Sequence, residues 1–374
     1  MKIKMTKVNL LQAMSHVCGV VERNPTLPIL SHCLLSASED KVNFSSTDLD
    51  HSVASLIPAE VERDGEAVIP AMTLYEISKK VPADVPVEID FKNNQVNLTF
   101  GKAKYTLQSL SSDEFPPIPQ PHRISRFEIS AIQFIKLIDT TKFAMSIDET
   151  RYMLNGAYLH IIKNSLEKKC LRMVATDAHR LSMSEISNPD IEAIENFSGI
   201  ILSRKTIVEL RRLMENETPE SVAVTLDKSL VSFQVGKVTL TARIVEGNFP
   251  DYVPVIPEKR DVFFTVKKQE FVDVIGRVSI IAGDKVKLIR LDLTAGRLQI
   301  SSNNENFGSA SDEIDAEYKG GPWYAGINSK YLLDVAGQIN SGVMRFYIQE
   351  SVASILIVDP SDNSSLFVVM PMRV

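Results

Sequence analysis

Apolar residues recur at helical spacing near the start of each third of the chain. Apolar residues three or four positions apart fall on one stripe of a helix, so each stretch predicts an amphipathic element. A second, shorter stripe follows in each third, after Pro70, Ser203 and Asn328, residue types that suit a helix start. The stripes predict six helices, over residues 8–23, 71–81, 130–146, 203–215, 267–282 and 328–340.

Alternating apolar and polar residues close the units and predict strands that bury one face. In the first third the alternation breaks at Asn93-Asn94 and ends in a glycine-lysine turn, Gly101-Lys102. The second third has the same arrangement, with a break near Asp227-Lys228 and a turn at Gly236-Lys237. The order of elements therefore repeats along the chain.

A polar, strand-like segment also recurs, over residues 42–55, 171–184 and 298–311. Its alignment places Thr47-Asp48 on Thr176-Asp177 and Asn303-Asn304. Proline-rich linkers, which favour extended connections, separate the units. We therefore predict an α+β protein made of three tandem copies of one domain, each with two helices packed on antiparallel sheets. The expected domains are 1–122, 123–252 and 253–374.

Composition predicts an ordinary soluble protein that stays in the cytoplasm. Of the 374 residues, 44% are hydrophobic and 24% are charged. No apolar stretch approaches the roughly 20 residues that span a bilayer, and the N-terminus does not have the pattern of a signal peptide. Cys18, Cys33 and Cys170 are widely spaced, which favours free buried thiols over disulfides or a zinc site.

The sequence offers little catalytic chemistry. It contains no His-x-x-x-His or Cys-x-x-Cys pair, and we expect no metal and no cofactor. Asp177 and His179 weakly resemble a catalytic relay, but no Gly-x-Ser-x-Gly motif accompanies them. The Ser-x-x-Lys spacing of Ser165 and Lys168 fits a solvated turn better than a nucleophile. We expect a protein that is not an enzyme.

Charge is unevenly distributed along the chain. The whole sequence carries −6, whereas the predicted helices sum to a positive charge, with the densest cluster at Arg204, Lys205, Arg211 and Arg212. Ordinary solvated helix faces would give the same pattern. A net negative protein is poorly suited to gripping nucleic acid by bulk electrostatics alone.

Five further sequence motifs follow one another along the chain. They are Pro25-Thr-Leu-Pro-Ile-Leu30, Arg151-Tyr-Met-Leu-Asn-Gly156, Val174-Ala-Thr-Asp-Ala-His-Arg-Leu181, Gly247-Asn-Phe-Pro-Asp-Tyr252 and Val369-Met-Pro-Met-Arg373. In this order they resemble the bacterial DNA polymerase III beta subunit, or DNA sliding clamp, family, and the likeness covers essentially the whole chain.

The resemblance implies a DNA sliding clamp. Two chains would join head to tail into a ring, with helices lining the bore and strands forming an outer sheet. The homodimer would encircle double-stranded DNA without sequence preference and confer processivity. Its implied partners are the replicative polymerase catalytic subunit, an ATP-dependent clamp loader, and other polymerases and repair proteins that carry short hydrophobic peptide motifs.

The resemblance also assigns residues to three sites. The DNA-facing set is Arg23, Asn24, Arg151, Tyr152, Arg204 and Lys205. The dimer interface set is Tyr105 and Leu107 against Ile280 and Ile281 of the facing end. The peptide pocket set is Leu154, Thr176, Ala178, His179, Arg180, Leu181, Pro250, Val255, Val286, Asn328, Tyr331, Val352, Ser354, Val368, Val369, Met370, Pro371, Met372 and Arg373.

A few positions depart from the family pattern. Asn24 and Met153 stand where relatives often carry arginine and an aromatic residue. Ala178, Pro254 and Val286 replace a common glycine, arginine and phenylalanine, so peptide preference is expected to differ. Three alternatives remain: a conventional DNA-binding protein that uses the basic helices, a hydrolase that uses Asp177 and His179, and a repeat scaffold unrelated to DNA.

Overall fold

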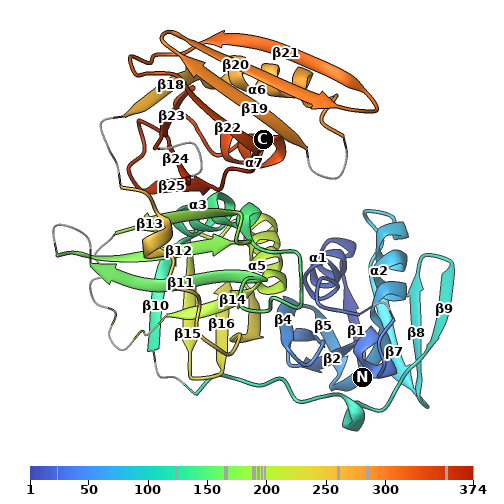
Figure 1. The fold of residues 1–374 in the computed structure, drawn as a ribbon. Coiled ribbons are helices and arrows are strands. Elements are labelled where there is room, and N and C mark those ends of the chain that lie inside the picture. Colours follow the sequence, from blue (N-terminus) through green and yellow to red (C-terminus); the bar gives the residue numbers. More distant parts are fainter. Residues whose placement is uncertain are drawn as a thin grey trace. The chain divides into compact units, whose positions relative to one another are not determined.

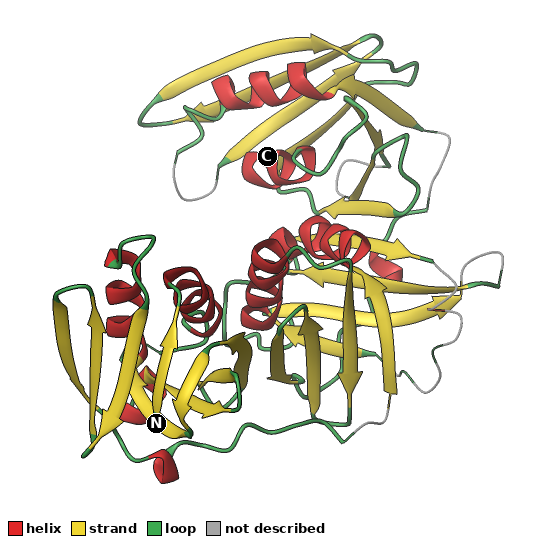
Figure 2. Ribbon diagram, turned by 180° about the vertical axis from the view of Figure 1, so that it is seen from behind, coloured by secondary structure: helices red, strands yellow, loops and turns green. Residues whose placement is uncertain are grey.

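The computed structural model describes residues 1–22, 24–122, 125–163, 167–187, 191, 194, 197, 199–258, 262–283, 287–349 and 353–373. It divides into two compact units. The first is formed mainly by Met1–Ile135 and Lys205–Ile244, and the second by most of the remaining residues. Each unit contains two antiparallel sheets with helices packed against them (Figures 1 and 2).

The first unit contains a five-stranded and an eight-stranded sheet. The five-stranded sheet has the order β5-β1-β7-β8-β9, with β1 at Lys2–Met5, β5 at Glu60–Arg63, β7 at Val87–Lys92, β8 at Gln95–Phe100 and β9 at Ala103–Gln108. The larger sheet has the order β10-β15-β16-β17-β4-β3-β2-β6. Its strands are β2 (His32–Ser38), β3 (Lys41–Thr47), β4 (His51–Pro58), β6 (Gly65–Pro70), β10 (Ser125–Ser130), β15 (Ser221–Leu226), β16 (Leu230–Val235) and β17 (Val238–Arg243).

The second unit repeats this plan with an eight-stranded and a four-stranded sheet. The larger sheet has the order β14-β11-β12-β13-β25-β24-β23-β18 and the smaller one β21-β20-β19-β22. The strands are β11 (Gly156–Lys163), β12 (Lys169–Thr176), β13 (Arg180–Ile186), β14 (Ile200–Ser203), β18 (Phe263–Lys267), β19 (Leu288–Thr294), β20 (Arg297–Asn304), β21 (Gly308–Asp315), β22 (Trp323–Asn328), β23 (Val343–Tyr347), β24 (Ile355–Val358) and β25 (Ser365–Val369).

All six predicted helices are present. They are α1 (Lys7–Val17), α2 (Ala71–Lys80), α3 (Ala131–Thr141), α5 (Arg204–Glu217), α6 (Lys268–Val278) and α7 (Ser329–Ala336). Asn328 caps α7 as expected, since its side chain accepts a hydrogen bond from the Lys330 amide. Short 3-10 turns are η1 (Pro28–Ser31), η2 (Ser112–Glu114), η3 (Lys142–Ala144) and η4 (Val253–Val255).

The predicted ends of four helices, α1, α3, α6 and α7, were too late. The first was expected to reach residue 23, but α1 ends at Val17, and Val20 and Val21 are buried after the helix has ended. Buried Ala144 and Met145 after α3 and buried Ile339 after α7 made those predictions too long in the same way. After α6, the exposed Ile280 and half-buried Ile281 continued the apolar spacing. Buried apolar residues beyond a helix end extend its apparent stripe, so hydrophobic spacing locates the helix better than its terminus.

The recurrent polar segments are hairpins, which corrects the prediction of single strand-like stretches. Each one is interrupted by a turn: between β3 and β4, between β12 and β13, and between β20 and β21. Asp48, Asp177 and Asn304 lie at these turns, and each side chain accepts hydrogen bonds from backbone amides that follow it. Such side-chain acceptors stabilise turns locally, which explains why polar residues recur there.

The predicted glycine turns are confirmed. Gly101 and Gly236 have φ values of +56° and +57°, a conformation that residues with a Cβ adopt at a steric cost. Asn93 and Asn94 also have positive φ, as a tight hairpin turn requires. The repeated positions therefore mark the same backbone geometry in two copies of the unit.

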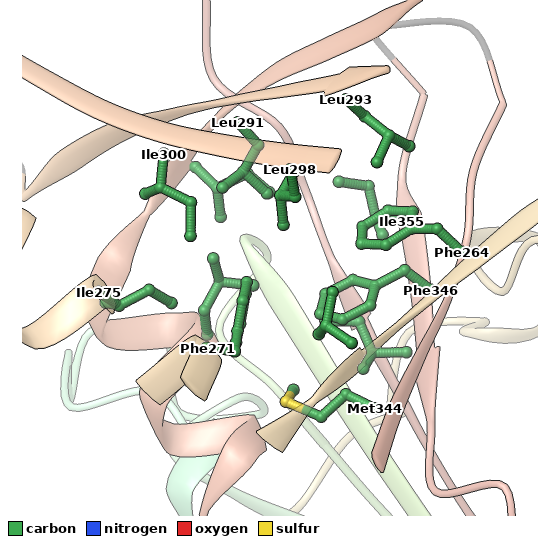
Figure 3. Close-up of a cluster of buried hydrophobic side chains, with 14 of the residues drawn as sticks. Phe264, Phe271, Ile275, Leu291, Leu293, Leu298, Ile300, Met344, Phe346 and Ile355 are labelled. Carbon is green, nitrogen blue, oxygen red and sulfur yellow. The ribbon is translucent and has the colours of Figure 1, made fainter. Parts of the chain in front are cut away.

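The amphipathic face of α6 packs into a core cluster of the second unit that includes residues of both its sheets. Figure 3 shows Phe271 and Ile275 from α6 pointing towards Leu291, Leu298 and Ile300 of the four-stranded sheet. Phe264 and Phe346 stack within the same cluster, with ring centroids 4.6 Å apart. The core thus holds the helix on one face of the sheet.

Candidate functional site

Arg180 lies at the centre of a group of predicted pocket residues in the second unit. Its side chain is 8% exposed, and its Nε donates to Asp177 Oδ2 at 3.0 Å. Its other nitrogens donate to Asp334 Oδ2 at 2.5 Å and to the Phe143 carbonyl at 2.7 Å. The guanidinium lies 4.5 Å from the Tyr331 ring centroid. One buried cation, compensated by two carboxylates, therefore ties β13 to α7 and η3.

The segment after β25 presents methionine side chains beside this Arg180 cluster. The Met370 amide donates to the His179 carbonyl at 2.9 Å, and the Met372 amide donates to the Gly326 carbonyl at 2.7 Å. The side chains remain accessible, with Met370 40% and Met372 37% exposed. A fixed backbone with solvent-facing thioethers forms an adaptable apolar surface.

Val255 extends this apolar surface. It is 40% exposed, and its carbonyl accepts a hydrogen bond from Ser354 Oγ at 3.5 Å. Ser354 directly precedes β24, whose Ile355 pairs with Val369 of β25. These contacts bring η4 next to the residues that precede Met370. Met370, Met372 and Val255 are called the methionine surface below.

The remaining predicted pocket residues differ in accessibility. Leu181, Val368 and Val369 are buried, so their side chains support the surface from below. Two predicted residues, Val286 and Val352, lie outside the described residues. Leu154, Thr176, Asn328, Tyr331, Ser354 and Pro371 are half-buried, whereas Ala178, His179, Pro250 and Arg373 are exposed.

The hydrogen bonds of Asp177 bear on the hydrolase alternative. Its Oδ1 accepts the backbone amides of His179 and Arg180 at 3.0 Å, and its Oδ2 accepts the Arg180 guanidinium. The carboxylate is therefore engaged in the turn and in charge compensation. A catalytic relay instead requires an aspartate that orients the imidazole ring. The geometry favours a structural role for Asp177.

A buried aromatic network anchors the segment that contains Pro250. Tyr252 is buried, and its hydroxyl lies 3.0 Å from His160 Nε2 and accepts from Arg172 Nη1 at 3.1 Å. Tyr158 stacks between His160 and Phe249, with centroid distances of 4.4 and 5.3 Å. Burial, with a contribution from the Arg172 charge, lowers the pKa of His160 to about 4.

The predicted DNA-facing residues of the second unit lie in accessible positions. Arg151 is exposed and lies 3.6 Å from Asp148, and Tyr152 is also exposed. Arg204 is half-buried and donates to the Met145 carbonyl at 3.4 Å. These residues can present positive charge and a ring face to a phosphate backbone.

In the first unit, Asn24 is exposed and Lys205 is already paired, while Arg23 lies outside the described residues. Lys205 Nζ lies 2.5 Å from Asp48 Oδ2. Burial opposes ionisation of Asp48, but hydrogen bonds from His51 and Lys205 outweigh it and hold the pKa of this carboxyl well below its usual range. Much of the Lys205 charge is therefore compensated within the chain.

Arg212, part of the densest predicted basic cluster, has a structural role that the sequence did not reveal. It donates to the Ser15 and His16 carbonyls at 2.5 and 2.9 Å and pairs with Glu209. Its charge therefore braces the end of α1 against α5 in the first unit. The i,i+3 spacing of Glu209 and Arg212 was the available sequence signal.

One pair of predicted interface residues lies on a sheet edge, and the other follows helix α6, which packs beside a second sheet edge. Strand β9, an edge of the five-stranded sheet, contains exposed Tyr105 and half-buried Leu107. Strand β21 is an edge of the four-stranded sheet, and Ile280, just after α6 in that unit, is 77% exposed. Ile281 is half-buried.

These edges differ in charge. Strand β9 carries Lys104 and follows Lys102, whereas β21 carries three carboxylates, Asp312, Glu313 and Asp315. An edge strand offers unpaired backbone groups for another strand. Asp312 and Glu313 already pair with Arg277 and Arg297 of the same chain, so the two edges are complementary in their backbone groups and partly complementary in charge.

Within the described part of the chain, no group of three or more His, Cys, Asp or Glu residues could hold a metal ion. No described helix is long and apolar enough to cross a membrane.

Comparison with known families identifies the architecture. Models of the DNA polymerase III beta subunit match the chain three times: the N-terminal domain over residues 1–119, the central domain over 128–251 and the C-terminal domain over 254–373. The chain belongs to the DNA polymerase III beta subunit family. It consists of three tandem clamp domains, as the sequence repeat predicted.

The chain is similar to named relatives over all or nearly all of their length. The beta sliding clamp of Caulobacter vibrioides is 38% identical, with both chains covered completely, and that of Pseudomonas aeruginosa is 34% identical over 97% of each. The solved Caulobacter crescentus polymerase III beta structure has a TM-score of 0.95 at 38% identity and full coverage of both chains. A Bartonella birtlesii clamp bound to griselimycin, at 35% identity and full coverage of both chains, also has a TM-score of 0.95.

These relatives support the function of a DNA sliding clamp, a processivity factor of replication whose family implies DNA and a polymerase as partners. The expected family, fold and function are therefore confirmed. The domain limits at residues 122 and 252 and the individual site residues remain predictions.

The lowered pKa of His160 predicts that the stability of the folded chain depends on pH. Its folded pKa of about 4 lies below the unfolded value of about 6.5, so the unfolded state binds the proton more readily. The free energy of unfolding therefore has its full value above about pH 6.5, the unfolded pKa. It decreases by about 3 kcal/mol as the pH falls from about 6.5 to 4. Thermal unfolding of His160→Gln should therefore show a smaller loss of Tm between pH 7 and 4.5 than the unsubstituted chain. The exposed His122, replaced by glutamine, is the control, and an unchanged pH dependence in His160→Gln would contradict the assignment.

Proposed function

We propose that two copies of this chain close head to tail into a ring around duplex DNA and tether replication proteins to it. The observation that carries the proposal is the pair of complementary sheet edges, β9 and β21. The contact would be heterologous, so each chain would use β9 once and β21 once, and two contacts would close the ring. The proposal assigns no catalytic step to this chain.

Edge pairing explains how the interface would be built. The backbone of β9 would add to β21 of the partner and extend the sheet by hydrogen bonding. Tyr105 and Leu107 would pack on Ile280 and Ile281 of the partner subunit and remove apolar surface from water. The lysines beside β9 would meet the acidic side chains of β21, which favours head-to-tail over head-to-head contact.

A closed ring would not need tight DNA binding. The DNA-facing set is proposed to be Arg23, Asn24, Arg151, Tyr152, Arg204 and Lys205. Because Asp48 compensates Lys205 and the whole chain carries −6, phosphate contacts would be few and exchangeable. Weak contacts of this kind allow the ring to slide, while closure prevents its escape.

The methionine surface is proposed as the docking site for partner peptides. The Arg180 cluster and the predicted pocket residues around it would form a rigid support, and the methionines would adapt to different apolar side chains. The expected partners are the polymerase catalytic subunit, an ATP-dependent clamp loader, and other polymerases and repair proteins in the bacterial cytoplasm. We propose domain limits of 1–122, 123–252 and 253–374.

The interface proposal predicts that Ile280→Asp weakens the dimer. A carboxylate buried against Tyr105 and Leu107 would lose its hydration, at a cost of about 3 kcal/mol at each of the two contacts, so the dimer dissociation constant should rise about 10,000-fold. Sedimentation equilibrium measures this change. Ile132→Asp is the matched control, since Ile132 is 80% and Ile280 77% exposed in the single chain. Equal dimer affinity in the two variants would refute the interface.

The docking proposal predicts that Met372→Asp weakens peptide binding without opening the ring. A fluorescein-labelled peptide with two leucines and a terminal phenylalanine should lose at least a hundredfold in affinity, because the new charge would be desolvated beneath its apolar side chains. Fluorescence polarisation gives the affinity, and primer extension with the polymerase and loader gives the processivity. Leu56→Asp, a change at an exposed residue of β4, should leave both unchanged. Normal peptide binding by Met372→Asp would exclude this surface as the docking site.

A further inference from the structure

The hairpin beside the methionine surface has a second copy in the first unit. In the β12–β13 turn, Thr176 Oγ1 donates to the Arg180 carbonyl at 2.6 Å and accepts the Ala178 amide at 3.1 Å. In the β3–β4 turn, Thr47 Oγ1 donates to the His51 carbonyl at 2.8 Å and accepts the Leu49 amide at 3.0 Å. Ala178 and Leu49 have φ values of +73° and +79°. The two turns therefore have the same threonine hydrogen bonds and the same positive φ at the equivalent position.

The neighbouring strand is also equivalent. Met370 donates its amide to the His179 carbonyl at 2.9 Å, and Arg243 donates its amide to the Asp50 carbonyl at 2.8 Å. In register, β25 pairs with β13 as β17 pairs with β4. Asp50 thus occupies the position of His179, and Arg243 occupies that of Met370. The β3–β4 turn with β17 is called the first junction, and the β12–β13 turn with β25 the second junction.

The helix contacts complete the correspondence. At the second junction the Arg180 side chain reaches Tyr331 of α7. At the first junction, the His51 side chain reaches Thr206 of α5, with Nε2 and Oγ1 3.1 Å apart. The backbone frame of a docking site is therefore present twice in each chain.

The side chains at the first junction have the opposite chemistry. Where the second junction exposes a methionine, the first exposes the guanidinium of Arg243, whose side chain is 61% exposed. Its Nε lies 3.4 Å from Asp50 Oδ1, and the Asp50 side chain is 70% exposed. An apolar ligand side chain laid over this pair would strip water from two ions and offer no hydrogen bond in return.

We propose that the Asp50–Arg243 pair excludes apolar peptides from the first junction and so restricts each chain to one docking site. This inference rests on the proposed docking at the second junction. The excluded ligand class is the short peptide with leucine and phenylalanine side chains. Asp50 and Arg243 are therefore specificity-determining residues that act by preventing binding.

The test converts the first junction to the chemistry of the second. The double substitution Asp50→His and Arg243→Met should raise the stoichiometry from one to two peptides per chain, measured by isothermal titration calorimetry with the peptide described above. Leu30 corresponds to Leu154, because each lies two residues before the equivalent strands β2 and β11, and its carbonyl accepts a backbone amide, that of Glu22 or Ser146. Leu30 is 4% exposed, whereas Leu154 is half-buried. The converted site has less apolar surface to offer, and its affinity should be about tenfold weaker than that of the native site.

Three variants show which site is occupied and whether the charges cause the exclusion. Met372→Asp alone should weaken binding at least a hundredfold, and its combination with the double substitution should restore binding of one peptide per chain at about a tenth of the native affinity. Exchange of the pair, Asp50→Arg with Arg243→Asp, retains both charges and should keep one peptide per chain. Peptide binding at the second junction of the doubly substituted chain shows that this variant is folded.

The outcomes separate the two hypotheses. No binding by the chain with all three substitutions, while the unsubstituted chain binds one peptide, would overturn the exclusion by Asp50 and Arg243 and leave the proposed function intact. Absence of binding by the unsubstituted chain would remove the docking proposal itself, and the inference would fall with it.

Discussion

Strands β13 and β25 pair over five residues, from Arg180 with Val369 to Ser184 with Ser365, and strands β4 and β17 pair in the same way. Each pairing joins strands of successive clamp domains into one eight-stranded sheet. This explains why the chain has three sequence repeats but two compact units, since each unit is built around one shared sheet. The positions of the proposed docking surface and of its altered copy both depend on this pairing.

Electrostatics then distinguishes the two shared sheets. At β13, the buried Arg180 is compensated by Asp177 and Asp334, and the neighbouring surface is left to methionines. At β4, the smaller His51 takes the place of Arg180, and Asp48 binds both His51 and Lys205. The same backbone therefore supports an apolar surface in one unit and a charged surface in the other.

The sequence predicted the repeat, all six helices and the glycine turns, because these depend on local periodicity and backbone conformation. It was less informative where a feature depends on distant partners. The pairing of Arg180 with Asp334 spans 154 residues and leaves no local pattern. The turn aspartates were aligned with one another correctly but were placed inside strands. Polar residues continue from these strands through the turn, so the change from strand to turn leaves no mark in the pattern of apolar and polar positions. Pocket assignments from resemblance could not separate Met370, which faces solvent, from Val369, which is buried.

Topological linkage to DNA is the central claim, and retention on circular and linear DNA tests it most directly. The protein is loaded on nicked circular DNA by a clamp loader with ATP, and gel filtration separates bound from free protein before and after one cut of the circle. A ring predicts retention on the circle and release once an end is available. Equal retention on the circular and the linear form would contradict encirclement and indicate ordinary affinity for DNA.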